Sequence, residues 1–238
     1  MKTKKVTKNF FVPENFYEQN AKNAYDAVVE NFPKTFFVGG MVRDLLLSKK
    51  ISDIDIATSA KPDEIINTLK SQNFKLDLEA KRFGVISIII GKHRIEITTF
   101  RNDLYDNSRY PKISFVKTPN MDSKRRDFTI NALYFQGKSL TIYDYTSGFL
   151  DLSKKLIRFI GKPGDRIQED PLRIIRAYRF KNQLHFTFEK KTEQAIKENL
   201  NLLSKLTTNK IYSEFKKIKS KSSRQDIEKN LHNYLQIK

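Results

Sequence analysis

The stretch FFVGGMVRDLLLSKKISDIDIAT, residues 36–58, combines a pair of glycines with closely spaced acidic residues. The apolar residues before Gly39-Gly40 predict a short strand, and Met41–Leu47 has the spacing of a short helix. Ile51–Ala57 alternates apolar and acidic residues, which predicts a second strand. Glycines between a strand and a helix can expose backbone N–H groups to a phosphate, whereas a lone Gly-Gly is also typical of an ordinary tight turn.

The acidic residues of the second strand suggest a metal site. Asp53 and Asp55 are two residues apart, so on a strand both carboxylates point to one face. Two close carboxylates repel each other unless a cation lies beside them, and oxygen ligands favour Mg²⁺. Glu96, on the strand of a later hairpin, is a candidate third ligand. A solvated strand edge is the alternative for the Asp-x-Asp pair alone, but Arg43 can reach a phosphate at the glycines, which favours two-metal phosphoryl transfer.

The charge of the chain indicates a polyanionic partner. The 238 residues include 45 basic and 27 acidic side chains, a net charge of +18. Residues 1–150 carry a net +7 and residues 151–238 a net +11, so the C-terminal part is the better candidate for contacting a phosphate backbone. Nucleic acid is the first expected partner and a membrane surface the second. A Lys-rich genome composition is the alternative explanation.

The absence of cysteine excludes disulfides and thiolate metal sites, and it fits a reducing cytoplasm. The basic N-terminus precedes no long apolar segment, so we expect no signal peptide. The longest apolar run, Val85–Ile90, is far too short to span a bilayer. No strongly amphipathic, aromatic-anchored helix stands out either, so nucleic acid is favoured over a membrane surface and we expect no membrane partner.

Hydrophobic periodicity predicts a mixed α/β part over about residues 10–148, followed by a helical part. Residues 101–122 are polar and are expected to be irregular. Residues 220–224 are expected to form a polar break before one short helix. Helices are expected at residues 13–32 and 61–71, strands at 36–38 and 51–57, and hairpins at 83–100 and 128–145.

Three further stretches accompany the opening one in a recognisable order: RRDFTINAL at 125–133, DYTSGFLDLSKKLIR at 144–158 and EDPLRIIRAYRF at 169–180. Together they resemble the motifs of the class II tRNA nucleotidyltransferases, the CCA-adding enzymes, and of the related bacterial poly(A) polymerases, within the DNA polymerase β superfamily. The resemblance covers about residues 34–181. It implies an α+β fold, with a polymerase-β-like catalytic head of mixed sheet and helices at residues 1–148. An all-helical neck at residues 149–238 would then select the nucleotide and bind RNA.

The resemblance also implies how the base is chosen. Asp170 and Arg173 would act as a template, because cytosine and adenine both offer an amino donor beside a ring-nitrogen acceptor. Uracil and guanine present the opposite pattern and would leave both side chains unpaired. Arg126 would bind phosphate or sugar, or be one of a solvated pair, and Asp127 would accept a hydrogen bond from a 2′-OH. The implied nucleotide-binding residues are Gly39, Gly40, Arg43, Arg126, Asp127, Asp170, Arg173, Arg176 and Arg179, the last two lining the triphosphate or the RNA.

The sequence departs from the family in three places. The loop YDNSRYP at 105–111, which resembles the flexible loop used in switching from C to A addition, keeps Arg109 but has Asn107-Ser108 in place of Asp-Gly. Residues 209–210 are Asn-Lys where the family usually has Glu-Arg. Relatives are also much longer, so the chain is expected to be a reduced enzyme or a partial one.

The implied reaction adds CMP and AMP from CTP and ATP to the 3′ end of tRNA and releases pyrophosphate, with two Mg²⁺ ions held by Asp53, Asp55 and Glu96. One alternative is a partial specificity: CC addition, A addition or poly(A) addition. Another is a catalytically silent RNA-binding module. No protein partner is indicated.

Overall fold

A computed structural model describes residues 4–6, 19–51, 53–90, 93–105, 111–218 and 220–235. The chain divides into two compact units. The first comprises Met1–Arg126 and Ile130–Gly148, and the second comprises Asp127–Thr129 and Phe149–Lys238. Three residues of the RRDFTINAL motif thus group with the C-terminal part of the chain.

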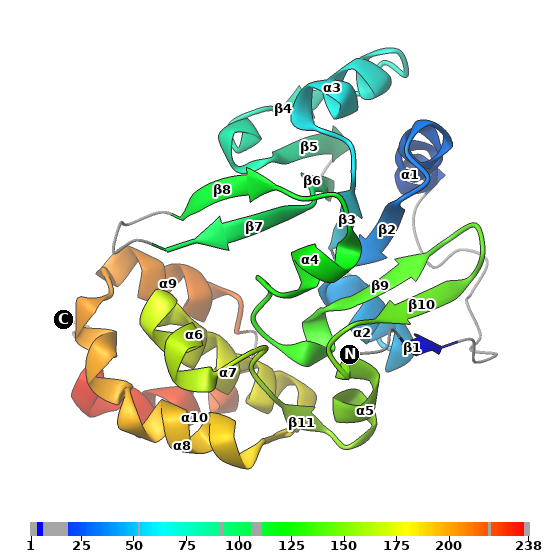
Figure 1. Cartoon of the computed structure of the whole chain (residues 1–238). Helices are drawn as coiled ribbons and strands as arrows, with labels where there is room; N and C mark the ends of the chain where they lie inside the picture. The colour runs from blue at the N-terminus through cyan, green and yellow to red at the C-terminus, as the bar shows by residue number, and fades with distance from the viewer. Residues whose placement is uncertain are drawn as a thin grey trace. The chain divides into compact units, whose positions relative to one another are not determined.

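The first unit is built on an eight-stranded sheet with the order β1-β10-β9-β2-β3-β6-β5-β4 (Figure 1). β3 and β6 run parallel, and the other neighbouring pairs described in this sheet are antiparallel. The mixed sheet expected for the head is therefore confirmed. The strands are β1 (Lys4–Val6), β2 (Thr35–Val38), β3 (Ile54–Thr58), β4 (Leu76–Asp77), β5 (Val85–Ile90), β6 (His93–Thr99), β9 (Leu133–Gln136) and β10 (Thr141–Asp144).

The alternation of side chains along β2 and β3 gives the sheet two different faces. Phe37 and Ile56 are fully buried and face the helices α1 (Gln19–Asn31) and α3 (Pro62–Lys70), which pack against each other and the sheet. Tyr25 of α1 stacks on Phe37 with ring centroids 4.3 Å apart, which fixes α1 on this face. The expected helix at 13–32 is confirmed over Gln19–Asn31, and residues 13–18 lie outside the described part.

The opposite face carries both a smaller core and the acidic residues. Phe36 and Ala57 project here and pack with Val38, Phe100 and Tyr134. Asp55 also projects to this face, because it alternates with Ile54 and Ile56 along β3. A short helix, α2 (Gly40–Leu46), follows β2 directly, so the glycine pair joins strand and helix as the sequence predicts.

The expectation of an irregular segment at 101–122 is wrong. β7 (Arg101–Leu104) pairs antiparallel with β8 (Lys112–Phe115), and α4 (Pro119–Ser123) follows. The strands escaped detection because Leu104 and Phe115 are exposed, so no buried apolar face marks the sequence. The helix has a clear local signal: Thr118 caps it by accepting a hydrogen bond from the Met121 amide, and Pro119 stands at its first turn.

The second unit is mainly helical, as expected for a neck. A two-residue parallel pair, β11 (Leu156–Ile157) and β12 (Thr187–Phe188), adds strand structure that the sequence did not predict. The expected polar break at 220–224 is wrong, because Ser220 accepts a hydrogen bond from the Ser223 amide and caps a helix. The helices are α5 (Gly148–Ser153), α6 (Pro163–Glu169), α7 (Leu172–Leu184), α8 (Lys190–Glu198), α9 (Thr208–Lys216) and α10 (Lys221–Leu231).

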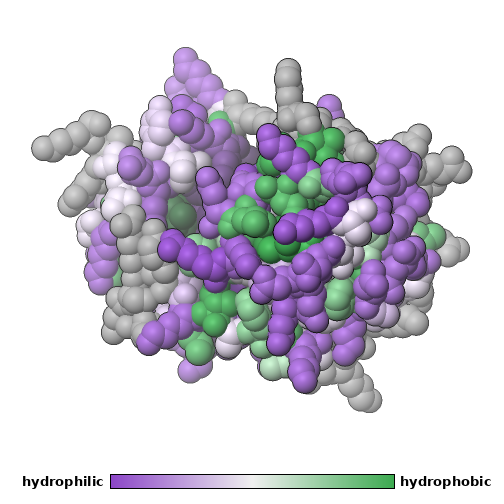
Figure 2. Space-filling model, turned by 90° about the horizontal axis from the view of Figure 1, so that it is seen from above, coloured by the Kyte–Doolittle hydropathy of each residue, from purple (hydrophilic) through white to green (hydrophobic). Residues whose placement is uncertain are grey.

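Figure 2 shows one face, on which hydrophilic residues predominate and hydrophobic residues gather in a central area. Among the helices that the structure describes, none is both long and apolar enough to cross a membrane.

Candidate nucleotide-binding and catalytic site

The sheet brings the predicted carboxylates of the first unit together. Asp55 on β3 lies directly opposite Glu96 on β6 in the parallel register, so both side chains project to one face. Asp53 lies two residues before Asp55, just ahead of the strand. Burial raises the pKa of Asp55 to about 6, and the charges of Glu96 and Asp53 add to this effect, while Arg126 opposes it. The site therefore concentrates negative charge that a cation would relieve.

The residues present fit a magnesium ion held mainly by Asp53 and Asp55. Across the described part of the chain, no three acidic, His or Cys side chains converge as a complete metal site. Glu96 instead accepts a hydrogen bond from Arg94 Nε at 3.3 Å, and Arg94 also pairs with Asp77 at 2.9 Å. Because Mg²⁺ usually binds through one or two carboxylates plus waters and substrate phosphates, two aspartates suffice on the protein side.

Gly39 sits against this carboxylate and cannot be replaced without strain. Its φ is 74° and its ψ is −143°, a conformation that side-chain-bearing residues rarely adopt. A Cβ atom at this position would lie 2.9 Å from Asp55 Oδ2 and 3.8 Å from Arg126 Nη1. At Gly40, a Cβ would lie 3.3 Å from Arg43 Nη2. The absence of a side chain at Gly39 therefore leaves room for the Asp55 carboxylate, and its absence at Gly40 leaves room for the Arg43 guanidinium.

Arg43, predicted to bind a phosphate, is held by side chains of the first unit. It is 7% exposed, its Nε and Nη2 donate to Asp44 at 2.9 Å each, and its Nη1 donates to Asn131 Oδ1 at 2.7 Å. These bonds tie α2 to the RRDFTINAL segment. The predicted role of Arg43 at a phosphate remains a prediction.

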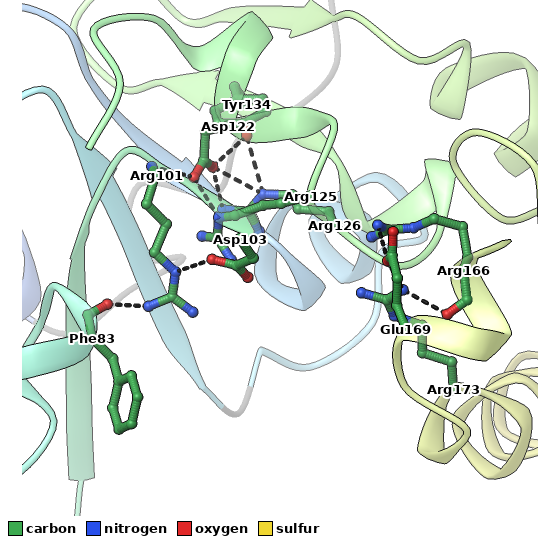
Figure 3. Close-up of polar contacts among 10 residues, drawn as sticks. All are labelled: Phe83, Arg101, Asp103, Asp122, Arg125, Arg126, Tyr134, Arg166, Glu169 and Arg173. Carbon is green, nitrogen blue, oxygen red and sulfur yellow. Dashed lines mark hydrogen bonds and ion pairs between the residues drawn. The ribbon is translucent and has the colours of Figure 1, made fainter. Parts of the chain in front are cut away.

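Arg126 lies in a buried polar cluster that the motifs did not reveal (Figure 3). Asp122 of α4 is fully buried, and its Oδ2 accepts hydrogen bonds from Tyr134 Oη at 2.6 Å and Arg126 Nη2 at 3.2 Å. Its Oδ1 accepts from Arg125 Nε at 2.7 Å. Although burial alone would raise the pKa of Asp122, these arginines and Tyr134 lower it to about 2. Burial raises the pKa of Tyr134 well above its usual range, so its hydroxyl stays protonated and can donate.

In the second unit, Asp127 is bound by an arginine of the nucleotide-selecting motif. Arg176 Nε donates to Asp127 Oδ2 at 2.9 Å, and Arg176 Nη1 donates to Glu214 Oε1 at 3.0 Å. Arg179 Nη2 donates to the same Glu214 oxygen at 3.2 Å. Both arginines thus join α7 to α9, and Arg176 also binds Asp127. Their expected contact with triphosphate or RNA remains a prediction. No sequence pattern predicted the burial of Glu214, which is 1% exposed.

The template pair predicted at the start of α7 is also in this unit. Arg173 is 5% exposed, and its Nη1 donates to the Arg166 carbonyl at 2.7 Å and to Glu169 Oε2 at 2.6 Å (Figure 3). Arg166 forms a further ion pair with Glu169. Asp170 is half-buried at the end of α6, and its Oδ1 accepts a hydrogen bond from the Leu172 backbone N–H at 3.2 Å. The guanidinium plane of Arg173 is therefore fixed before any ligand binds. Arg109, predicted for the flexible loop, lies outside the described residues.

Residues 35–158 match the family described as the poly(A) polymerase head domain, which is just over half of the chain. The chain belongs to this family. The matched range contains all the candidate residues of the first unit and Asp127, whereas Asp170, Arg173, Arg176 and Arg179 lie beyond it. The family resemblance and the fold class predicted from the sequence are confirmed.

The chain is similar in sequence to curated CCA-adding enzymes. The chain is 46% identical over 188 residues to a CCA-adding enzyme of Lactobacillus johnsonii, covering 78% of the chain and 46% of the relative. It is 38% identical over 205 residues to one of Bacillus subtilis, covering 84% and 50%. The chain thus spans about half the length of the curated relatives it matches.

Solved structures show the same likeness. The CCA-adding enzyme of Bacillus stearothermophilus in complex with CTP has a TM-score of 0.80 and 30% identity, covering 94% of this chain and 54% of that one. The Thermotoga maritima CCA-adding enzyme complexed with tRNA_CCA has a TM-score of 0.72 and 26% identity, covering 92% and 52%.

Proposed function

We propose that this chain is a template-independent RNA nucleotidyltransferase that adds CMP and AMP, from CTP and ATP, to the 3′ end of tRNA. The observation that carries the proposal is the opposition of Asp55 and Glu96 on neighbouring strands, with Asp53 just ahead of β3 and Gly39 packed without a side chain against the Asp55 carboxylate. This arrangement occurs in a poly(A) polymerase head domain, and the relatives at 38% and 46% identity are CCA-adding enzymes.

In the proposed reaction, the RNA 3′-OH attacks the α-phosphate of the nucleotide, and pyrophosphate leaves. Asp53 and Asp55 would hold Mg²⁺, with Glu96 as a further ligand after exchange from Arg94. When bound in such a site, Mg²⁺ would lower the pKa of the attacking hydroxyl and neutralise phosphate charge, and two ions would share these roles in a two-metal site. Gly39 lets a phosphate approach without meeting a Cβ, and Arg126 binds the triphosphate.

The second unit would choose the base. Asp170 accepts from the exocyclic amino group of cytosine or adenine, and the preset guanidinium of Arg173 donates to the adjacent ring nitrogen. Arg176 and Arg179 act in this proposal by holding Asp127 and Glu214 in place. Asp127 accepts a hydrogen bond from the ribose 2′-OH of the bound nucleotide in this proposal. The net charge of +11 on residues 151–238 supplies non-specific attraction for the tRNA. We place the protein in the cytoplasm, since its proposed substrate is a cellular RNA and its sequence has no cysteine.

The deciding experiment uses a tRNA transcript that lacks its terminal CCA. The chain is incubated with Mg²⁺ and with CTP alone, ATP alone or both, and the added residues are sequenced. The expected product is CC with CTP alone and CCA with both nucleotides. A product of CC only, of a single A, or of a long A tract would replace CCA addition with that partial activity. Tight tRNA binding without any addition would show an RNA-binding module instead.

A further inference from the structure

The side chain of Arg126 is held at two of its nitrogens by residues outside the family motifs. Its Nη2 donates to Asp122 Oδ2 at 3.2 Å, and its Nε donates to Tyr134 Oη at 3.0 Å. The Tyr134 ring also lies under the guanidinium, with its centroid 5.2 Å from Arg126 Cζ. An arginine side chain has several rotatable bonds, so such contacts set one orientation in advance of ligand binding.

The orientation that results is directed at the catalytic face. A Cβ atom built on Gly39 would lie 3.8 Å from Arg126 Nη1 and 2.9 Å from Asp55 Oδ2. The guanidinium and the carboxylate therefore both border the space beside Gly39. Asp122 and Tyr134 are thus linked through Arg126 to the neighbourhood of Asp55, the carboxylate that we assign to the metal.

Asp122 also connects this arginine to the neighbouring hairpin. Its Oδ1 accepts a hydrogen bond from the backbone N–H of Arg101, the first residue of β7, at 3.1 Å. The Asp122 carboxylate on α4 therefore accepts hydrogen bonds at once from β7, from Arg125 just after α4 and from the hydroxyl of Tyr134 on β9. A buried carboxylate in so many bonds has one stable position, so it is a rigid support rather than a solvated charge.

We propose that Asp122 and Tyr134 are positioning residues that aim the Arg126 guanidinium at the triphosphate of the incoming nucleotide, beside Gly39 and Asp55. The inference rests on the proposed function, because it takes the ligand at Asp55 to be a nucleoside triphosphate. Tyr134 supplies the finer control, since its hydroxyl bridges Asp122 and Arg126. Removing that hydroxyl leaves the ring in the core and releases only the bridge.

The test measures the equilibrium affinity for CTP with Mg²⁺ in the absence of RNA. We expect Tyr134→Phe to weaken CTP binding about tenfold, which corresponds to one hydrogen bond to a charged group. Tyr143 is the cross-strand partner of Tyr134 and packs against the same core, so Tyr143→Phe is the matched control. It is expected to leave the CTP affinity unchanged. Urea unfolding of both variants identifies any general loss of stability.

A double-mutant cycle separates positioning from packing. Arg126→Lys removes the guanidinium fork, so adding Tyr134→Phe to it should weaken CTP binding little further. Asp122→Asn should weaken CTP binding as Tyr134→Phe does. If Asp122→Asn fails to fold, the CTP affinity of Tyr134→Phe alone tests the inference. Additive losses in the cycle, or equal losses for Tyr134→Phe and Tyr143→Phe, would overturn the inference. If the unmodified chain binds CTP but adds nothing to tRNA, the proposed function fails, while the CTP affinities still decide this inference.

Discussion

Asp127 accepts a hydrogen bond from Nε of Arg176, a residue 49 positions further along the chain, at 2.9 Å. This contact joins the RRDFTINAL motif to the EDPLRIIRAYRF motif inside the second unit. Two segments that the sequence presents as separate signatures therefore share one polar network, which continues through Arg176 to the buried Glu214.

Replacing Arg176 should destabilise the second unit. Arg176→Ala removes charged hydrogen bonds to Asp127 and to Glu214, while Arg179 and Lys217 still bind Glu214. We expect a loss of about 2 kcal/mol in the free energy of unfolding, measured by urea titration. Lys197→Ala, which breaks an exposed pair with Glu193, is the control and should cost less than about 1 kcal/mol. Equal losses of unfolding free energy in the two variants would show that the buried network contributes no more than an exposed ion pair.

The buried carboxylate of Asp122 predicts an acid-sensitive fold. Its pKa is about 2 in the folded chain, lowered from 3.8. A lowered pKa stabilises the fold at pH values above the unfolded pKa, and this contribution is lost as the pH falls from about 4 towards 2. The contribution is on the order of 2 kcal/mol. Unfolding titrations between pH 7 and pH 2 should show the decline, and Asp122→Asn should flatten it. A parallel pH profile in this variant would assign the decline to other groups.

The candidate site of the first unit was predictable from local signals. Asp55 and Glu96 lie on strands where acidic residues alternate with apolar ones, and Gly39 marks the end of a strand. Asp53 was expected on the same strand as Asp55, but it lies just ahead of β3. Asp122 and Glu214 gave no such signal, because each is an acidic residue in a polar segment and looks solvated. Their burial depends on partners that fold brings from elsewhere: Tyr134 is 12 residues from Asp122, and Arg176 is 38 residues from Glu214. Periodicity in one stretch carries no information about such contacts.

Gly39 should not tolerate a side chain. Gly39→Ala places a Cβ 2.9 Å from Asp55 Oδ2 and forces alanine to a φ of 74°. We expect a loss of about 1–2 kcal/mol of stability and a large loss of CTP incorporation, since the carboxylate must move. Gly164→Ala is the matched control, because a Cβ there meets nothing within 4 Å. It should leave incorporation unchanged. Normal incorporation by the Gly39 variant would remove this residue from the site.

Removing the proposed metal ligands should separate catalysis from RNA binding. Asp55→Asn and Asp53→Asn are expected to abolish nucleotide addition in Mg²⁺ while filter-binding assays still detect the tRNA complex, because the positive charge of residues 151–238 is untouched. Asp77→Asn is the control: Asp77 lies on β4 of the same sheet and pairs with Arg94. It should keep its activity. Near-normal turnover in either Asp53 or Asp55 variant would refute the two-metal assignment.

Arg173 should determine which bases are accepted. Its guanidinium is fixed by the Arg166 carbonyl and by Glu169, so a substitution removes a donor that is already in position. In Arg173→Ala, we expect the preference for CTP and ATP over UTP and GTP to fall roughly tenfold to a hundredfold, equivalent to about 1–3 kcal/mol of lost pairing. Incorporation of each nucleotide is measured separately on the truncated tRNA. Arg158→Ala, which breaks an ion pair with Asp151 in the same unit, is the control and should keep the preference. An unchanged preference in a folded Arg173→Ala protein would exclude this residue from base selection and leave Asp170 without its proposed partner.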